Sequence, residues 1–238
     1  WFHILDVGGC SVIRLFAKLV GSNLPKVLRR LVQAYRLLVP QPLTSSEKQF
    51  VERNTSFWAT YSRDESGDGY VLVEHQSLPV VLLSDASFAS ILCQARNLKP
   101  LFMLPSAART TQKQILASYP NATFFYLPVW RNVVWRIRAI LEARRVYRSL
   151  EGPQSLLDLE IDGFNVGHII YDDVLITHGY ATIEKIDHKV FDVLHRFFVA
   201  QYTIKHLLGK YRIEAAVICQ LMGLMSGTLS KYLLSRGT

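Results

Sequence analysis

Short apolar runs rich in β-branched and aromatic residues alternate with segments of helical length between Tyr70 and Leu127. Such runs are typical of strands that are buried on both faces of a parallel sheet. Their spacing is that of βαβ units, which favours an α/β fold with a doubly wound, mainly parallel, Rossmann-like sheet and helices on both faces. The pattern predicts strands near 71–74, 80–83, 100–104, 123–127 and 214–219.

Helices are expected between these strands and after them. Ser84 and Asp85 follow the second apolar run and are interpreted as the cap of a helix that continues to about Arg96. The other helices are expected at 107–118, 130–150, 187–208 and 226–235, and the second of these four is strongly basic.

Residues 1–69 are expected to form a helical, basic extension and linker, and residues 70–238 the Rossmann-like domain. Within 27–38, apolar and basic residues recur near the helical period. Two interpretations of this segment stay open: a membrane-surface helix whose basic side chains reach anionic headgroups, and a packing helix with a solvated basic face. Residues 43–69 are polar and end in a strong turn signal, Asp64–Gly69.

The charge balance favours an anionic partner. Lys and Arg number 27 against 19 Asp and Glu, which gives a formal net charge of +8. The sequence contains no RNP-like aromatic motif, no zinc-finger spacing and no glycine-rich phosphate loop. Nucleic acid is therefore not expected as a partner, whereas an anionic membrane surface fits the charge.

The cysteines and the hydropathy pattern bear on the compartment. Cys10, Cys93 and Cys219 are far apart, which argues against a disulfide framework and against a metal site. No run of 18 apolar residues occurs, so no transmembrane helix is predicted. We expect a cytoplasmic protein, peripheral on the inner face of the membrane if it binds lipid at all.

The highest density of polar side chains lies in residues 162–179. Carboxylates and imidazoles in this segment are groups that can take a proton from a sugar hydroxyl, and its glycines allow sharp turns or close approach to a ligand. The alternative is a turn and a short amphipathic helix that the Asp residues cap. The candidates with acid–base chemistry are Asp172, Asp173, His168 and His178, and those for substrate binding are Asp162, Asn165, Gly167 and Tyr171.

Two short motifs carry a family resemblance. The stretch Gly167-His168-Ile169-Ile170-Tyr171-Asp172 is similar to the Gly-Asp-Leu-Ile-Tyr-Asp stretch of bacterial surface-carbohydrate and capsule-biosynthesis proteins. The stretch 227–237 resembles the Gly-x-x-x-Arg-x-Ala-Leu-x-x-Gly segment that follows a long helix and a strand in that family. Four features depart from the family pattern: His168 replaces Asp, Lys231 replaces Arg, Ile176 replaces Arg, and the residue after Asp172 is a second Asp.

The resemblance implies the first, acceptor-side half of a two-domain, GT-B-type glycosyltransferase. It implies a nucleotide-sugar donor, a carbohydrate or glycolipid acceptor, and neither a metal nor another cofactor. A donor-binding domain is then expected after residue 238, and the isolated chain is expected not to transfer sugar. Gly223 and Gly227 flank the start of the last helix, where free N–H groups favour an anion, and Lys231 follows one turn later.

Two other function classes stay open. One is a non-catalytic, degenerate α/β binding or scaffold domain at the membrane surface. The other is a nucleotide- or nucleic-acid-binding protein, which only the basic charge and the fold favour. His75 is a weaker site candidate, because it lies at the carboxyl end of the first predicted strand, where α/β folds bind ligands.

Overall fold

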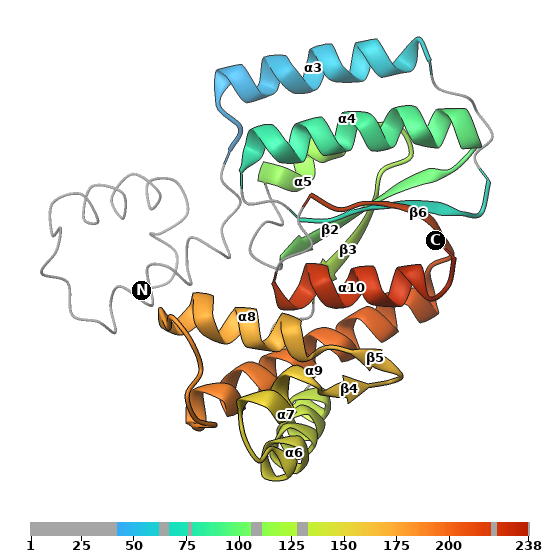
Figure 1. Ribbon diagram of the computed structural model, residues 1–238. Helices are drawn as coiled ribbons and strands as arrows, with labels where there is room; N and C mark the ends of the chain where they lie inside the picture. Colours follow the sequence, from blue (N-terminus) through green and yellow to red (C-terminus); the bar gives the residue numbers. More distant parts are fainter. Residues whose placement is uncertain are drawn as a thin grey trace, which may run out of the picture. The chain divides into compact units, whose positions relative to one another are not determined.

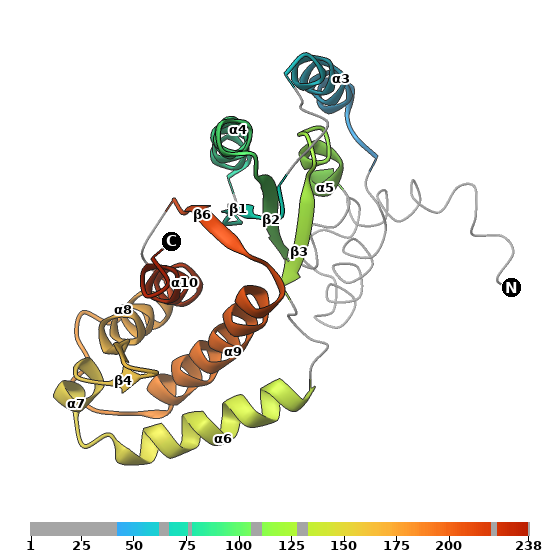
Figure 2. The same cartoon turned by 90° about the vertical axis from the view of Figure 1, so that its right-hand side faces the viewer.

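The computed structural model describes residues 42–61, 67–75, 78–105, 111–127, 133–219 and 223–237. Its central element is a four-stranded sheet (Figure 1) in which every pair of neighbouring strands is parallel, in the order β3-β2-β1-β6 (Figure 2). The strands are β1 Tyr70–Val73, β2 Lys99–Pro105, β3 Thr123–Leu127 and β6 Ile213–Val217. The predicted parallel α/β sheet is confirmed, with four of its five strands.

The fifth predicted strand, at 80–83, is wrong. Helix α4, Pro79–Arg96, occupies these residues, with Pro79 in the first turn, where a proline costs the helix no hydrogen bond. The helix buries residues at helical spacing, among them Leu82, Ala86 and Cys93. Ser84 and Asp85 therefore lie inside the helix and do not cap it.

Helices cover both faces of the sheet, as predicted. Helices α3 (Ser45–Ala59), α4 and α5 (Thr111–Leu116) lie on one side, and α9 (His188–Lys210) and α10 (Leu224–Leu234) on the other (Figure 2). Alternate strand residues enter the two cores because successive side chains of a strand point to opposite faces. Val71, Val73, Phe102 and Leu104 belong to the first core, and Leu72, Leu101, Met103 and Phe125 to the second.

Helix α3 lies in the polar part of the predicted extension and linker, where no individual helix was assigned. Thr44 and Glu47 form a capping box, in which each side chain bonds to the backbone N–H of the other residue. Trp58 supplies the buried contact, because its side chain is 6% exposed and lies in the core with α4 and the sheet. A capping signal and one large aromatic residue therefore define this helix.

A second, mainly helical region packs along α9. It contains α6 (Val133–Ser149), α7 (Pro153–Leu157), the short hairpin β4–β5 (Glu160–Ile161 and Phe164–Asn165) and α8 (Gly167–His178). The predicted helices at 130–150, 187–208 and 226–235 are confirmed as α6, α9 and α10. Asp187 caps α9 by accepting from the N–H groups of Lys189 and Val190.

Three expectations fall partly or wholly outside the described residues. The basic helix at 27–38 lies outside them. The turn at 64–69 and the helix at 107–118 are only partly covered, because 64–66 and 107–110 lie outside the described residues. The unit that carries the sheet begins at Thr44, so α3 belongs to it.

Candidate functional site

The carboxyl edge of the sheet between β1 and β6 is where the chain order reverses. From β1 the chain crosses to β2 on one side, and β6 pairs with β1 on the other. Loops that leave two such strands diverge, and open α/β sheets bind ligands in the crevice between them. Glu74 and His75 follow β1 at this edge, and α10 begins beyond β6.

Glu74 is the most buried ionisable side chain at this edge, with 5% of its surface exposed. Its Oε1 accepts a hydrogen bond from the Ser226 hydroxyl in the first turn of α10. Its Oε2 is buried and has no hydrogen-bond partner among the described residues. Burial raises the pKa of Glu74, the Ser226 bond lowers it in part, and the nearby charge of Asp85 raises it again.

Two more groups near Glu74 share this state. The Oδ2 atom of Asp85 in α4 and the Nδ1 atom of His75 are buried, and neither has a partner within the described part of the chain. Burial raises the pKa of Asp85 and lowers the pKa of His75, so both groups shift toward their uncharged forms. Unpaired buried acceptors are costly, and a ligand that brings hydroxyl donors would remove that cost.

The predicted polar segment at 162–179 folds as a hairpin turn and a helix. Asp162 and Gly163 are the two turn residues between β4 and β5, with φ of 54° and 77°. Positive φ at both positions is the mark of a type I′ turn, for which Asp-Gly is a preferred pair. The glycine at 163 therefore serves the turn.

One oxygen of the Asp162 carboxylate has three donors. Its Oδ2 accepts from the Tyr232 hydroxyl, from Gln201 Nε2 at 2.8 Å and from Lys205 Nζ at 2.6 Å. Burial alone would raise the pKa of Asp162, but the bonds from Lys205 and Tyr232 outweigh it and the pKa lies below its ordinary value. This carboxylate ties the hairpin to α9 and α10.

Gly167 is required by packing at the start of α8. A Cβ atom there would lie 2.1 Å from the Leu156 carbonyl oxygen and 2.3 Å from that of Leu157. Asn165 reinforces the same junction, because its Nδ2 donates to the Leu157 carbonyl at 3.1 Å. These two candidates for substrate binding hold the hairpin and α8 against α7.

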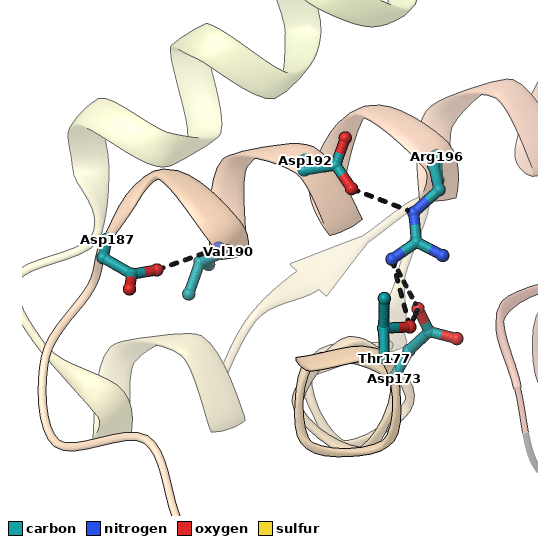
Figure 3. Close-up of polar contacts among 6 residues, drawn as sticks. All are labelled: Asp173, Thr177, Asp187, Val190, Asp192 and Arg196. Carbon is teal, nitrogen blue, oxygen red and sulfur yellow. Dashed lines mark hydrogen bonds and ion pairs between the residues drawn. The ribbon is translucent and has the colours of Figure 1, made fainter. Parts of the chain in front are cut away.

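The two adjacent aspartates of α8 have different surroundings. Asp173 forms an ion pair with Arg196 of α9 at 3.1 Å, and Thr177 donates to the same carboxylate oxygen at 3.2 Å (Figure 3). Arg196 also pairs with Asp192 one turn earlier in its own helix. Asp172 is exposed on α8. Both lie in the interior of the helix, so the alternative in which they cap it is wrong.

The remaining candidates fall into two groups. His168 is exposed, His178 has a buried Nε2 without a partner among the described residues, and the Tyr171 hydroxyl holds the loop after α8 by bonds to Thr182 and Ile183. On α10, Gly223 is the N-cap residue with φ of 91°, Gly227 is buried in the first turn, and Lys231 is exposed.

Helix α10, which carries the second group, is bonded to Glu74 through Ser226. Within the described residues, no hydrogen bond or ion pair joins the α8 candidates to Glu74. No group of three or more His, Cys, Asp or Glu side chains in the described part of the chain could hold a metal ion. None of the described helices is long and apolar enough to span a membrane.

No protein-family model, curated protein or solved structure matches this chain. The site must therefore be judged on its own geometry and on the two motifs quoted above.

Glu74, Asp85 and Ser226 are the residues that sequence reasoning missed. The sequence does contain an indication for Glu74. This residue lies at the end of the first apolar run and directly precedes His75, the weaker candidate at the carboxyl end of the first predicted strand. Asp85 was missed because the strand predicted at 80–83 made it a helix cap, whereas it lies within α4 in the structure. Ser226 was expected only as the first residue of a helix.

Proposed function

We propose that this chain is the acceptor-side half of a GT-B-type glycosyltransferase that builds a surface polysaccharide or glycolipid. The acceptor sugar binds at the edge between β1 and β6. The observation that supports this proposal best is the Glu74 carboxylate, which is almost fully buried at that edge and has one oxygen without a partner among the described residues. The resemblance of 167–172 and 227–237 to the surface-carbohydrate family points the same way.

The chemistry of transfer assigns Glu74 a role. An acceptor hydroxyl attacks the anomeric carbon of the nucleotide sugar, the new C–O bond forms, and the nucleotide leaves with the electron pair of the broken bond. The hydroxyl proton passes to Glu74 Oε2, while Ser226 holds Oε1. A raised pKa suits such a base, because it brings the carboxylate closer to the pH at which it works.

Other groups at the edge would orient the acceptor. Asp85 and His75 each present a buried polar atom without a partner among the described residues, which suits a polyol whose hydroxyl groups both donate and accept. The donor nucleotide would be held mainly by a second domain, and the donor is a substrate, so no further cofactor is invoked. The catalytic roles predicted for Asp172, Asp173, His168 and His178 remain predictions.

The test is an acceptor-dependent transfer assay on the protein made from its full coding sequence. Nucleotide sugars of several bases are incubated with oligosaccharide and glycolipid acceptors, and nucleotide release is measured beside the mass of the glycan product. We expect release to require an acceptor, and we expect the 238-residue chain alone to bind acceptor without turnover. Sustained turnover by the isolated chain would contradict the half-enzyme proposal.

One observation favours the second candidate, a non-catalytic binding or scaffold domain. Asp173, a predicted acid–base residue, is occupied by an ion pair with Arg196, and the family motif is altered at His168 and Lys231. In that case the full protein binds the acceptor glycan, and no nucleotide sugar is consumed with any donor tested.

A further inference from the structure

Helix α6 presents two very different faces. On one, Ala139 and Ala143 are fully buried against α9, and the Trp135 ring lies 5.3 Å from the His206 ring of α9. The small alanines allow the two helices to pack closely. The opposite face of α6 is exposed along the whole helix.

The first half of this exposed face is apolar. Val133, Val134, Ile137 and Leu141 each have more than half of their surface exposed. Their spacing places them on one side of the helix over a little more than two turns, because residues three, four and seven apart share a face. A single exposed apolar side chain needs no explanation, but a contiguous group of four marks an interaction surface.

The exposed face also carries arginines. Arg138, Arg144, Arg145 and Arg148 are exposed, and none of them forms an ion pair with a carboxylate of the described residues. The only acidic residue of α6 is Glu142, which lies half-buried at the margin. The surface therefore combines apolar contact area with uncompensated positive charge.

This combination selects the partner. A second copy of the chain seated on the same face would bring arginines against arginines, which is repulsive. A lipid surface with anionic headgroups complements both parts, since apolar side chains enter the boundary of the acyl region and long basic side chains reach phosphate oxygens. We propose that α6 docks on an anionic membrane surface through Val133, Val134, Ile137 and Leu141 together with these four arginines.

This docking surface is separate from the site between β1 and β6, so its failure would leave the proposed transfer reaction untouched. The experiment is co-sedimentation of the protein with vesicles of phosphatidylcholine mixed with phosphatidylglycerol, compared with vesicles of phosphatidylcholine alone. We expect binding to the mixed vesicles only. Binding should be weaker at about 1 M salt than at about 0.1 M salt, because the screening length falls from about 10 Å to about 3 Å.

A triple variant, Arg144→Gln with Arg145→Gln and Arg148→Gln, tests the charge. Each arginine near an anionic surface contributes about 1 kcal/mol, so affinity should fall roughly a hundredfold. The matched control removes three exposed charges from other elements: Arg53→Gln, Arg96→Gln and Lys185→Gln. Equal losses in both triples, or equal binding to neutral vesicles, would overturn the assignment to α6.

A pair of variants tests the apolar part. Ile137→Ser with Leu141→Ser should weaken binding at least tenfold, whereas Phe88→Ser with Ile91→Ser on α4 should not, although those side chains are as exposed. Thermal unfolding shows that each variant is folded. If the α6 pair instead abolishes self-association in lipid-free solution and no vesicle binding is seen, the occupant is a second copy and the membrane proposal is wrong.

Discussion

Two carboxylates in this molecule show how different the surroundings of an acidic side chain can be. Asp162, in the hairpin, has three donors directed at one oxygen, and its pKa lies below the ordinary value. Glu74, at the sheet edge, has one donor for its two oxygens within the described part of the chain, and burial raises its pKa. The first carboxylate holds elements together, and the second has an oxygen available for a ligand.

The comparison extends to the residues around each group. In the segment 162–179, polar side chains are numerous in the sequence, and many of them have hydrogen-bond or ion-pair partners. Asn165 Oδ1 and His178 Nε2 are buried without a partner among the described residues, but they do not lie in one cluster with Glu74. Near Glu74 they are few in the sequence and come from three separate elements, and Glu74 Oε2, His75 Nδ1 and Asp85 Oδ2 are buried without a partner among the described residues. A site is therefore indicated better by unmet hydrogen-bonding capacity than by the local density of polar residues.

The largest expected effect is on catalysis, through Glu74→Gln. The amide keeps the shape and the bond from Ser226 but cannot accept a proton, so the transfer rate of the full protein should fall about 10²–10⁴-fold. Acceptor-dependent nucleotide release measures this. Asp172→Asn and Asp173→Asn are made beside it. A large rate loss in either one without a loss of stability, together with full activity in Glu74→Gln, would move the base to α8.

Gly167→Ala should cause the largest loss of stability. Its Cβ would meet two carbonyl oxygens of α7 inside normal contact distance, so backbone must shift, at a cost of about 1–3 kcal/mol. Gly209→Ala is the control, because Gly209 lies in α9 with open space around it and should gain about 0.5–1 kcal/mol. Urea unfolding measures both. An unchanged free energy of unfolding in Gly167→Ala would refute the packing role of this glycine.

Asp162→Asn should cost somewhat less. Asn tolerates the positive φ of the turn as Asp does, so the substitution removes only the charge that Lys205 and Tyr232 recognise. Hydrogen bonds to a charged group contribute about 1.5–3 kcal/mol, and partial exposure reduces this to about 1–2 kcal/mol here. The loss is read from the melting temperature, and no loss would mean that the network is not a stabilising feature.

The pH dependence of stability should differ in sign between the two carboxylates. The pKa of Asp162 is lowered on folding, so its contribution is complete above its unfolded value, about 3.9, and is lost as the pH falls through the folded value. The pKa of Glu74 is raised, so its ionisation destabilises the fold as the pH rises from about 4.3 through the folded value.

The variants isolate these two contributions. The free energy of unfolding is measured between about pH 3 and pH 8, a range that includes the ordinary carboxyl pKa values. Asp162→Asn should be about as stable as the wild type in acid and less stable near neutrality. Glu74→Gln should be as stable as the wild type in acid and more stable than the wild type as the pH rises. If the free energy of unfolding depends on pH in the same way in all three proteins, the predicted difference between the two carboxylates is wrong.

The smallest expected effect separates the neighbouring aspartates of α8. Asp173→Asn loses the ion pair with Arg196, which is partly exposed, so the cost should be about 0.5–1 kcal/mol. Asp172→Asn alters an exposed side chain and should change the free energy of unfolding by less than about 0.5 kcal/mol. Guanidinium unfolding measures the free energy of unfolding of both variants. Equal losses would show that the ion pair with Arg196 does not stabilise the fold.

The sequence predicted the sheet well because buried parallel strands are short, apolar and bounded by turns. It failed at 79–83, where the same apolar run after a proline begins a helix that is buried on one side, and periodicity over five residues cannot separate the two. It missed α3, because one tryptophan and a capping box give little hydrophobic pattern.

The site was harder to predict for a different reason. Glu74, Asp85 and Ser226 come together only through the crossing of the chain at β1, and the last two are 141 positions apart in the printed sequence. In contrast, the hairpin turn at Asp162-Gly163 is a local signal. Local chemistry could therefore be predicted, and chemistry assembled by topology could not.

Helix α9 has a consequence for how the molecule unfolds. Its 23 residues span about 35 Å at 1.5 Å per residue. Val190, Leu194 and Phe197 lie in the helical core, and Ile204, Leu207 and Leu208 lie in the core beneath the sheet. One continuous series of backbone hydrogen bonds thus runs through both cores. Because both cores pack on this helix, opening one of them destabilises the other. The amides in the middle of α9 should exchange with solvent only by global unfolding, and the two regions should melt as one cooperative unit.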